Sequence, residues 1–109
     1  MAKHEFGIME RAPRTGERYD EYEPELYGCI SVDDELIEKM AWDVQNVHCF
    51  WHTVDRAGKG LAYTGVTLIP PESLGEIIAV LGEKNELSAL RQLMEKAMRE
   101  EKFVIHFGL

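Results

Sequence analysis

The chain has 109 residues, of which 45% are apolar and 29% are charged, as expected for one folded globular domain rather than several. Its 20 acidic and 12 basic residues give a net charge of −8. Because binding to nucleic acid or to anionic lipid needs a basic surface, this charge argues against a nucleic-acid or membrane partner. The negative charge is spread along the chain, so we attribute it to solubility, with a basic partner protein as the alternative.

The start of the chain lacks the apolar core of a signal peptide, and no apolar run approaches the ~20 residues that span a bilayer. Two cysteines, Cys29 and Cys49, lie in strand-like surroundings. Without an export signal, they are predicted to be reduced and buried. We therefore expect a cytoplasmic protein, and no sequence pattern calls for a cofactor.

Residues 1–25 are predicted to form an irregular N-terminal arm, because they mix proline, glycine and charge without a helical or strand period. Within this arm, residues 6–9 are compatible with a short strand. Residues 26–109 are predicted to form a single α+β domain. Its first strand covers residues 26–32, and Asp33 can then cap an amphipathic helix whose apolar positions recur up to residue 47.

Two further strands are predicted at residues 47–54 and 61–69, and a glycine-bearing loop joins them as an antiparallel hairpin. Pro70 and Pro71 then open a helix that Gly82 ends. Another amphipathic helix follows from Asn85, and residues 103–107 form the last strand. The order β-α-β-β-αα-β predicts a ferredoxin-like split βαβ sheet with strand order 4-1-3-2, antiparallel neighbours and helices on one face.

Helices on one face leave the other face of the sheet to be explained. With a hairpin register that pairs Phe50 with Gly65, strand alternation assigns each side chain to a face. The helix-covered face then includes Val66, Leu68, Ile105 and Phe107. The open face collects Tyr27, Cys29, Ser31, His48, Phe50, His52, Tyr63, Thr67, Val104 and His106. A one-residue shift in register would exchange the two faces.

Three interpretations of this open face compete. The face packs against a second copy of the chain, or the N-terminal arm crosses it with Phe6 and Ile8 as plugs, or it lines a small-molecule site. Candidate ligand-binding residues are His48, His52, Tyr63, His106 and Tyr27. Candidate interface residues are Phe50 and Trp42, the latter because it lies opposite the apolar stripe of its helix.

The chemistry of these residues narrows the functional classes. His52 opposite Tyr63 is suited to proton transfer near neutral pH, although a cross-strand hydrogen bond without turnover is the simpler explanation of the pair. His48 and His52 on one strand would stand roughly 13 Å apart, too far for one ion, so no metal site is predicted. Our leading hypothesis is a small binding protein that forms a homodimer through the open face. The alternative is a small-molecule-binding protein or acid–base enzyme with a His/Tyr-lined pocket, and catalysis is the less favoured of these roles.

Overall fold

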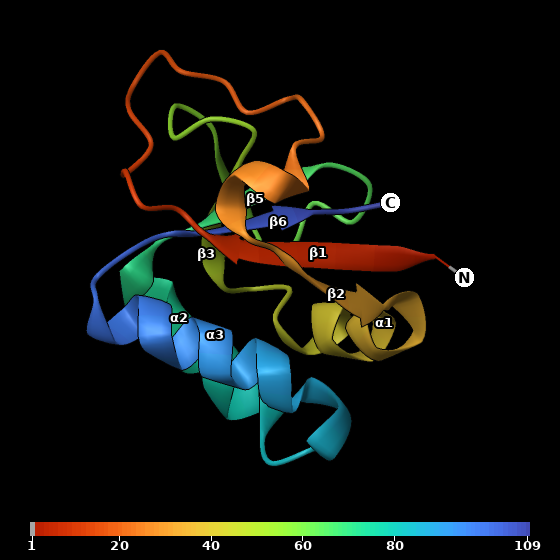
Figure 1. Ribbon diagram of the computed structural model, residues 1–109. Coiled ribbons are helices and arrows are strands. Elements are labelled where there is room, and N and C mark those ends of the chain that lie inside the picture. Colours follow the sequence, from red (N-terminus) through yellow and green to blue (C-terminus); the bar gives the residue numbers. More distant parts are fainter. Residues whose placement is uncertain (1) are drawn as a thin grey trace.

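The computed structural model describes residues 2–109, which form a mixed α+β fold around a six-stranded antiparallel sheet (Figure 1). The strands are β1 (Lys3–Ile8), β2 (Ile30–Asp33), β3 (His48–Trp51), β4 (Ala57–Lys59), β5 (Val66–Ile69) and β6 (Val104–Phe107). Their order across the sheet is β2-β1-β6-β5-β3-β4, and each neighbouring pair is antiparallel. The α+β class and the antiparallel neighbours predicted from the sequence are thus confirmed.

The helices lie where apolar periodicity predicts them. They are α1 (Asp34–Asp43), α2 (Pro71–Leu81) and α3 (Ser88–Arg99), and two short 3₁₀ helices, η1 (Pro24–Tyr27) and η2 (Asn85–Leu87), precede β2 and α3. α1 carries acidic residues in its first turn, where the helix dipole favours negative charge. α2 begins at a proline and ends at Gly82, whose φ of 58° a residue without a side chain adopts most easily.

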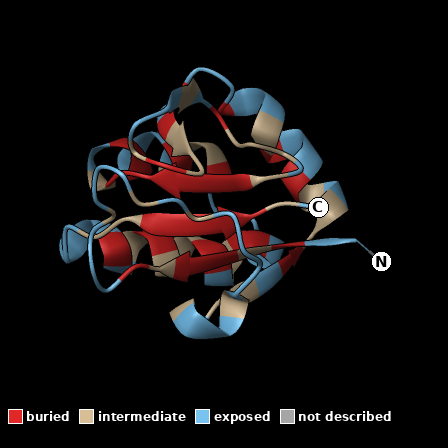
Figure 2. Cartoon of the chain, turned by 90° about the horizontal axis from the view of Figure 1, so that it is seen from above, coloured by how far each residue is buried: buried red, intermediate tan, exposed pale blue. Residues whose placement is uncertain are grey.

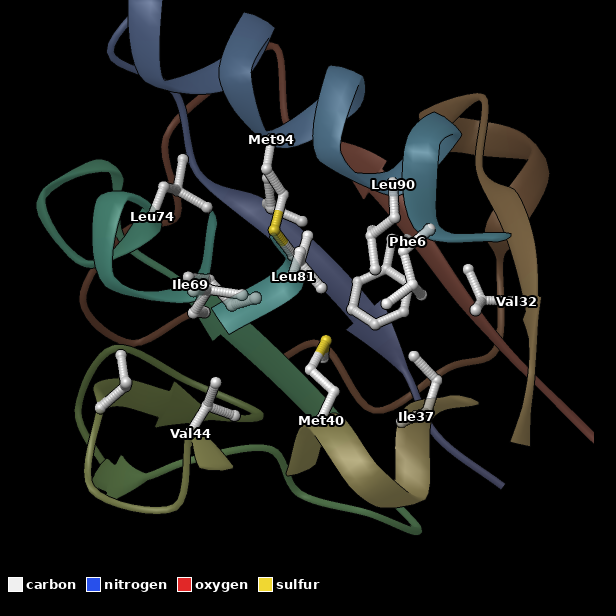
Figure 3. Packing of buried hydrophobic residues seen from close by; sticks show 14 of the residues in the cluster. Phe6, Val32, Ile37, Met40, Val44, Ile69, Leu74, Leu81, Leu90 and Met94 are labelled. Atoms are coloured by element: carbon white, nitrogen blue, oxygen red, sulfur yellow. The ribbon is translucent and has the colours of Figure 1, made fainter. Parts of the chain in front are cut away.

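All three α-helices pack against the same face of the sheet, which we call the helix face (Figures 1 and 3). Side chains from the strands meet side chains from the helices there in one continuous buried core. Its labelled members in Figure 3 are Phe6, Val32, Ile37, Met40, Val44, Ile69, Leu74, Leu81, Leu90 and Met94. The central strands are buried along most of their length (Figure 2), so burial of this core is the main source of stability.

The predicted strand order 4-1-3-2 is wrong, because the arm contributes a strand that was not placed in the sheet. β1 pairs with β2 on one side and with β6 on the other, which separates the first predicted strand from the last. β6 pairs with β5 instead, and β5 pairs with β3 as the predicted hairpin requires. Residues 3–8 therefore lie within the sheet, whereas residues 9–25 of the predicted arm lie outside it (Figure 1).

The predicted register of the hairpin is also wrong. Phe50 pairs with Leu68, whereas the predicted register paired it with Gly65. The difference arises because the expected loop contains β4, which pairs directly with β3 and makes the connection to β5 longer. The register of β5 against β3 therefore differs from the predicted one by three residues. Because side chains alternate between the two faces of a sheet, a shift by an odd number of residues moves each side chain of β5 to the opposite face.

Because of this shift, the side chains of the central strands lie on the opposite faces of the sheet from those predicted. Val66, Leu68, Ile105 and Phe107 point away from the helices, onto what we call the second face, where they form a separate buried cluster with Met9. Thr67 and His106, which were predicted on the open face, are fully buried on the helix side beside Phe6. The second face is therefore strongly apolar, contrary to the mixed His/Tyr surface that the predicted register implied.

Candidate functional site

The second face of the sheet is covered by the same chain. Tyr19, Tyr27 and Cys29 pack on it from the N-terminal segment (Figure 1). Two hydrogen bonds fix this cover: Tyr19 N–H donates to the backbone carbonyl of His52 at 2.7 Å, and Gly16 N–H donates to the side-chain carboxylate of Asp55 at 2.7 Å. Part of the N-terminal arm thus crosses the second face.

The residues expected to act as plugs do not perform that role. Phe6 and Ile8 belong to β1, and both pack in the core on the helix face. The covering side chains come instead from the part of the arm that follows β1. Because this part uses up much of the apolar second face, little of that face is left for a sheet-to-sheet contact with another molecule.

A pocket of about 440 Å³ remains at one end of the second face, between the arm and the ends of the central strands. Its walls come from five separate parts of the chain. The lining residues are Lys3, Glu5, Asp20, Tyr22, His52, Thr64, Gly65, Val66, Phe107, Gly108 and Leu109. The volume lies in the range of ~300–1,000 Å³ that is common for small-molecule sites, and the wall combines apolar surface with a few polar groups.

His52 is the most constrained residue of this wall. It follows β3 with a φ of 65°, a left-handed conformation that is uncommon outside glycine. Two backbone bonds hold it: its N–H donates to the Val66 carbonyl at 3.0 Å, and its carbonyl accepts the bond from Tyr19. Such a conformation costs on the order of 1–3 kcal/mol, and such residues are concentrated at functional sites.

The two ring nitrogens of His52 have different surroundings. Nε2 accepts a long hydrogen bond of 3.4 Å from Val66 N–H. Nδ1 is buried 2.9 Å from Asp20 Oδ1, but without the alignment of a directed hydrogen bond. We therefore treat the His52–Asp20 contact as an electrostatic one.

Asp20 joins His52 to a cation. Arg18 donates two hydrogen bonds to its carboxylate, at 2.8 Å and 3.2 Å. The Arg18 guanidinium, and more weakly His52, hold the pKa of Asp20 below its usual value. Asp20 therefore stays ionised, and it connects the arm to the wall of the pocket.

A second polar pair lies across the pocket. The Tyr22 hydroxyl donates to the Glu5 carboxylate, and this bond raises the pKa of the phenol. The Tyr22 ring, 64% exposed, stands edge-on to Phe107 with centroids 5.6 Å apart. The pocket thus offers a carboxylate and a phenol next to an aromatic surface.

Gly65 makes room for the imidazole. A Cβ atom at this position would lie only 2.6 Å from His52 Nε2. Gly65 has an ordinary φ, so the requirement for glycine here comes from the close approach of the ring and not from backbone conformation.

The predicted ligand-binding residues do not gather in one place. His52 lines the pocket, but Tyr63 and His106 lie on the helix side of the sheet, and His48 is exposed near Phe50 at a centroid distance of 4.8 Å. Tyr27, the last residue of η1, packs toward Phe107. The predicted pairing of His52 with Tyr63 is therefore wrong.

Of the two predicted interface residues, Phe50 packs against the cluster on the second face. Trp42 is 72% exposed on α1, as its position opposite the apolar stripe predicted.

Tyr63 and His106 belong to a second polar group, which includes a histidine that sequence reasoning missed. His106 Nε2 and His4 Nδ1 are 2.8 Å apart, and His4 Nε2 lies 2.9 Å from Asp34 Oδ1. The Tyr63 hydroxyl donates to the same Asp34 oxygen, which raises the pKa of Tyr63 to about 12. These bonds from Tyr63 and His4 lower the pKa of Asp34.

Comparison of the chain with protein-family models, with curated proteins and with solved structures finds no match. Among residues 2–109, no helix combines the length and the apolar character that crossing a membrane would require.

Proposed function

We propose that this protein binds a small molecule in the pocket between the arm and the second face. The observation that carries the proposal is His52, held in a left-handed conformation at the wall of a 440 Å³ pocket whose other walls mix apolar and charged groups. The strain is offset by contacts that shape the pocket.

The positions of the two ring nitrogens of His52, both turned toward other parts of the chain, favour binding over turnover. A general base must present a free nitrogen to its substrate. In His52, Nδ1 faces Asp20 and Nε2 faces the backbone of Val66. We therefore assign His52 the role of positioning Asp20 and the adjoining backbone, and proton transfer to a ligand remains the less favoured role of the pocket.

The walls define the kind of molecule that fits. Val66 and Phe107 provide an apolar floor, whereas Glu5 and Asp20 provide carboxylates at two sides. A compact molecule with a flat apolar part and hydrogen-bond donors at its edge matches this arrangement.

A fragment screen followed by amide chemical-shift mapping tests the proposal. We expect bound fragments to shift the amides of Gly65, Val66 and Phe107, and His52→Gln to weaken binding at least tenfold. His48→Gln is the matched control, because His48 lies exposed on the same strand outside the pocket. Fragments that bind elsewhere, or binding that His52→Gln leaves unchanged, would contradict the proposal.

Self-association through α1 is a second candidate function, and exposed Trp42 favours it. The groove beside Trp42 contains Leu36 together with charges of both signs, among them Glu35 and Lys39. Mixed charge around an aromatic residue is self-complementary across a two-fold axis, as an isologous dimer needs.

Sedimentation of the wild type and of Trp42→Ala at micromolar concentrations tests this second role. A wild-type dimer that the substitution converts to a monomer supports it. A wild-type monomer refutes it.

A further inference from the structure

β2 forms one edge of the sheet (Figure 1), and β4 forms the other. An edge strand carries backbone N–H and C=O groups that no strand of its own sheet can pair. β4 is a poor template for a further strand, because it has only three residues, among them Gly58 and Lys59. β2 has the sequence Ile-Ser-Val-Asp, with neither a proline nor a basic residue. Of the two edges, β2 is therefore better suited to the addition of a strand.

Hydrogen bonds at the two ends of β1 show which backbone groups of β2 point outward. Asp34 N–H donates to the Ala2 carbonyl at 3.0 Å, so the even-numbered residues along β1 bond toward β2. Met9 N–H donates to the Phe103 carbonyl at 2.9 Å, so the odd-numbered residues bond toward β6. This alternation is the rule for an antiparallel strand between two neighbours. The residues of β2 that lie opposite odd-numbered residues of β1 therefore direct their backbone groups away from the sheet.

Ser31 is the central residue of this outward-facing set. It lies opposite Glu5, so its N–H and C=O both point away from β1. Ile30 and Val32 lie opposite even-numbered residues and use their backbone groups inside the sheet. In the described part of the chain, residues 2–109, no hydrogen bond reaches Ser31, and the residue is exposed. The edge thus presents one backbone donor and one acceptor to a partner strand.

A groove of about 600 Å³ lies beside this edge, between η1 and α3. Most of its lining is apolar, and Leu26 of η1 is 64% exposed there. Side chains on one face of an added strand would lie level with Ile30 and enter this groove, because side chains alternate along a strand. The apolar lining residues are Ile8, Leu26, Tyr27, Ile30, Ala89 and Leu93.

The other face of an added strand would meet mainly carboxylates. Glu5, Asp33 and Lys3 share the second face at this edge, with Lys3 directly opposite Asp33. Glu25 of η1 adds to the negative charge: burial, and then the charges of Glu5 and Glu25, raise the pKa of the nearby Cys29 thiol to about 12. With more carboxylates than ammonium groups on this side, the edge favours a basic side chain on the strand that it receives.

We propose that the β2 edge binds an extended segment of a partner protein in which apolar residues alternate with lysine or arginine. The backbone of the segment pairs with Ser31, its apolar side chains enter the groove between η1 and α3, and its basic side chains face Glu25 and Asp33. Ser31, Leu26 and Glu25 do not line the pocket beside His52, so this proposal does not rest on the proposed function.

NMR titration of the protein with a capped hexapeptide of alternating valine and lysine tests the proposal. The control is a hexapeptide of alternating valine and glutamate. We expect the lysine peptide to shift the amides of Ser31 and Asp33 and to slow hydrogen exchange at Ser31, whose N–H is unpaired in the free protein. The glutamate peptide should bind about tenfold more weakly. Absence of binding, equal binding of the two peptides, or shifts confined to other elements would overturn the proposal.

Ser31→Pro removes the outward N–H without removing a bond to β1, and proline is tolerated on an edge strand. Ser31→Ala is the matched control, because it keeps the N–H. Binding of the lysine peptide should weaken about tenfold in Ser31→Pro and stay unchanged in Ser31→Ala; equal affinities would overturn the proposal. The exchange rate of Ser31 in the wild type keeps the test decisive if Ser31→Pro does not fold. Protection of Ser31 that rises with protein concentration in the absence of peptide would assign the edge to a second copy of the chain and would also overturn the proposal.

Discussion

Gly65→Ala tests the architecture of the pocket with a single methyl group. The added Cβ would stand 2.6 Å from His52 Nε2 and 3.3 Å from Cε1. To restore an ordinary contact of 3.4 Å, the ring must retreat by about 0.8 Å. Asp20 lies 2.9 Å from the other ring nitrogen, and the backbone of His52 is bonded on both sides, so the ring has little freedom to move.

The expected cost is that of overpacking a site whose neighbours cannot relax, about 1–3 kcal/mol of unfolding free energy. Urea denaturation followed by far-UV circular dichroism measures this loss, and the ring signals of His52 should shift in the same variant. Fragment binding in the pocket should weaken together with stability.

Gly75→Ala is a control with the opposite expected sign. Gly75 is exposed in the middle of α2, and a Cβ there would meet only the Met98 sulfur at 3.8 Å. Alanine in a helix interior is more stable than glycine by roughly 0.5–1 kcal/mol. If Gly65→Ala proved as stable as the wild type with unchanged His52 signals, the close packing of ring against backbone would be refuted.

Three further outcomes follow from burial and charge. Leu68→Ala removes a fully buried side chain from the second face and should lower the free energy of unfolding by ~2–5 kcal/mol. Leu26 is 64% exposed, so Leu26→Ala should change this free energy by less than ~0.5 kcal/mol. Equal losses of the two variants in urea denaturation would contradict the burial of Leu68. Burial raises the pKa of Cys29 and of Cys49 to about 12. Neither thiol should therefore react with Ellman's reagent at pH 7.5 until urea unfolds the chain, and rapid reaction of the native protein would refute this prediction. Asp20→Asn should lower the free energy of unfolding by less than ~1 kcal/mol, because the Arg18–Asp20 ion pair is solvent-exposed. The substitution should nevertheless speed hydrogen exchange at the amide of Tyr19, and an unchanged exchange rate would contradict the anchoring role of Asp20.

The local elements of the fold could be predicted from the sequence. The three α-helices follow apolar periodicity, and the boundaries of α2 follow from Pro71 and Gly82, whose backbone chemistry allows few alternatives. The strands at β3, β5 and β6 follow from runs of β-branched and aromatic residues. These signals are encoded within a few neighbouring residues, so one sequence is enough to detect them.

The assembly of the strands could not be predicted in the same way. β1 contains His4 and Gly7, which weaken its strand pattern, and its partners in β2 and β6 are distant in sequence. β4 resembles a turn because it contains Gly58, yet it pairs with β3 and thereby shifts the register to β5. The resulting exchange of faces carried His106 into the core, and the predicted open face disappeared with it.

The candidate site was predictable only in part. His52 was singled out for its predicted place on the open face opposite Tyr63; it does line the pocket, but Tyr63 is not beside it. Asp20, Tyr22 and Gly65 had no local signal, because their roles depend on contacts that exist only after the arm has folded over the sheet. Tertiary contacts of this kind cannot be inferred from residue spacing.

The pocket beside His52 is proposed to receive a small molecule. The most direct test is a crystal structure of the protein soaked with a mixture of small aromatic and amine-bearing fragments. We predict a bound fragment against Val66 and Phe107, within hydrogen-bonding distance of Asp20 or Glu5, with the left-handed backbone of His52 unchanged. A pocket that stays empty at saturating fragment concentration, or fragments bound only elsewhere on the molecule, would contradict the account.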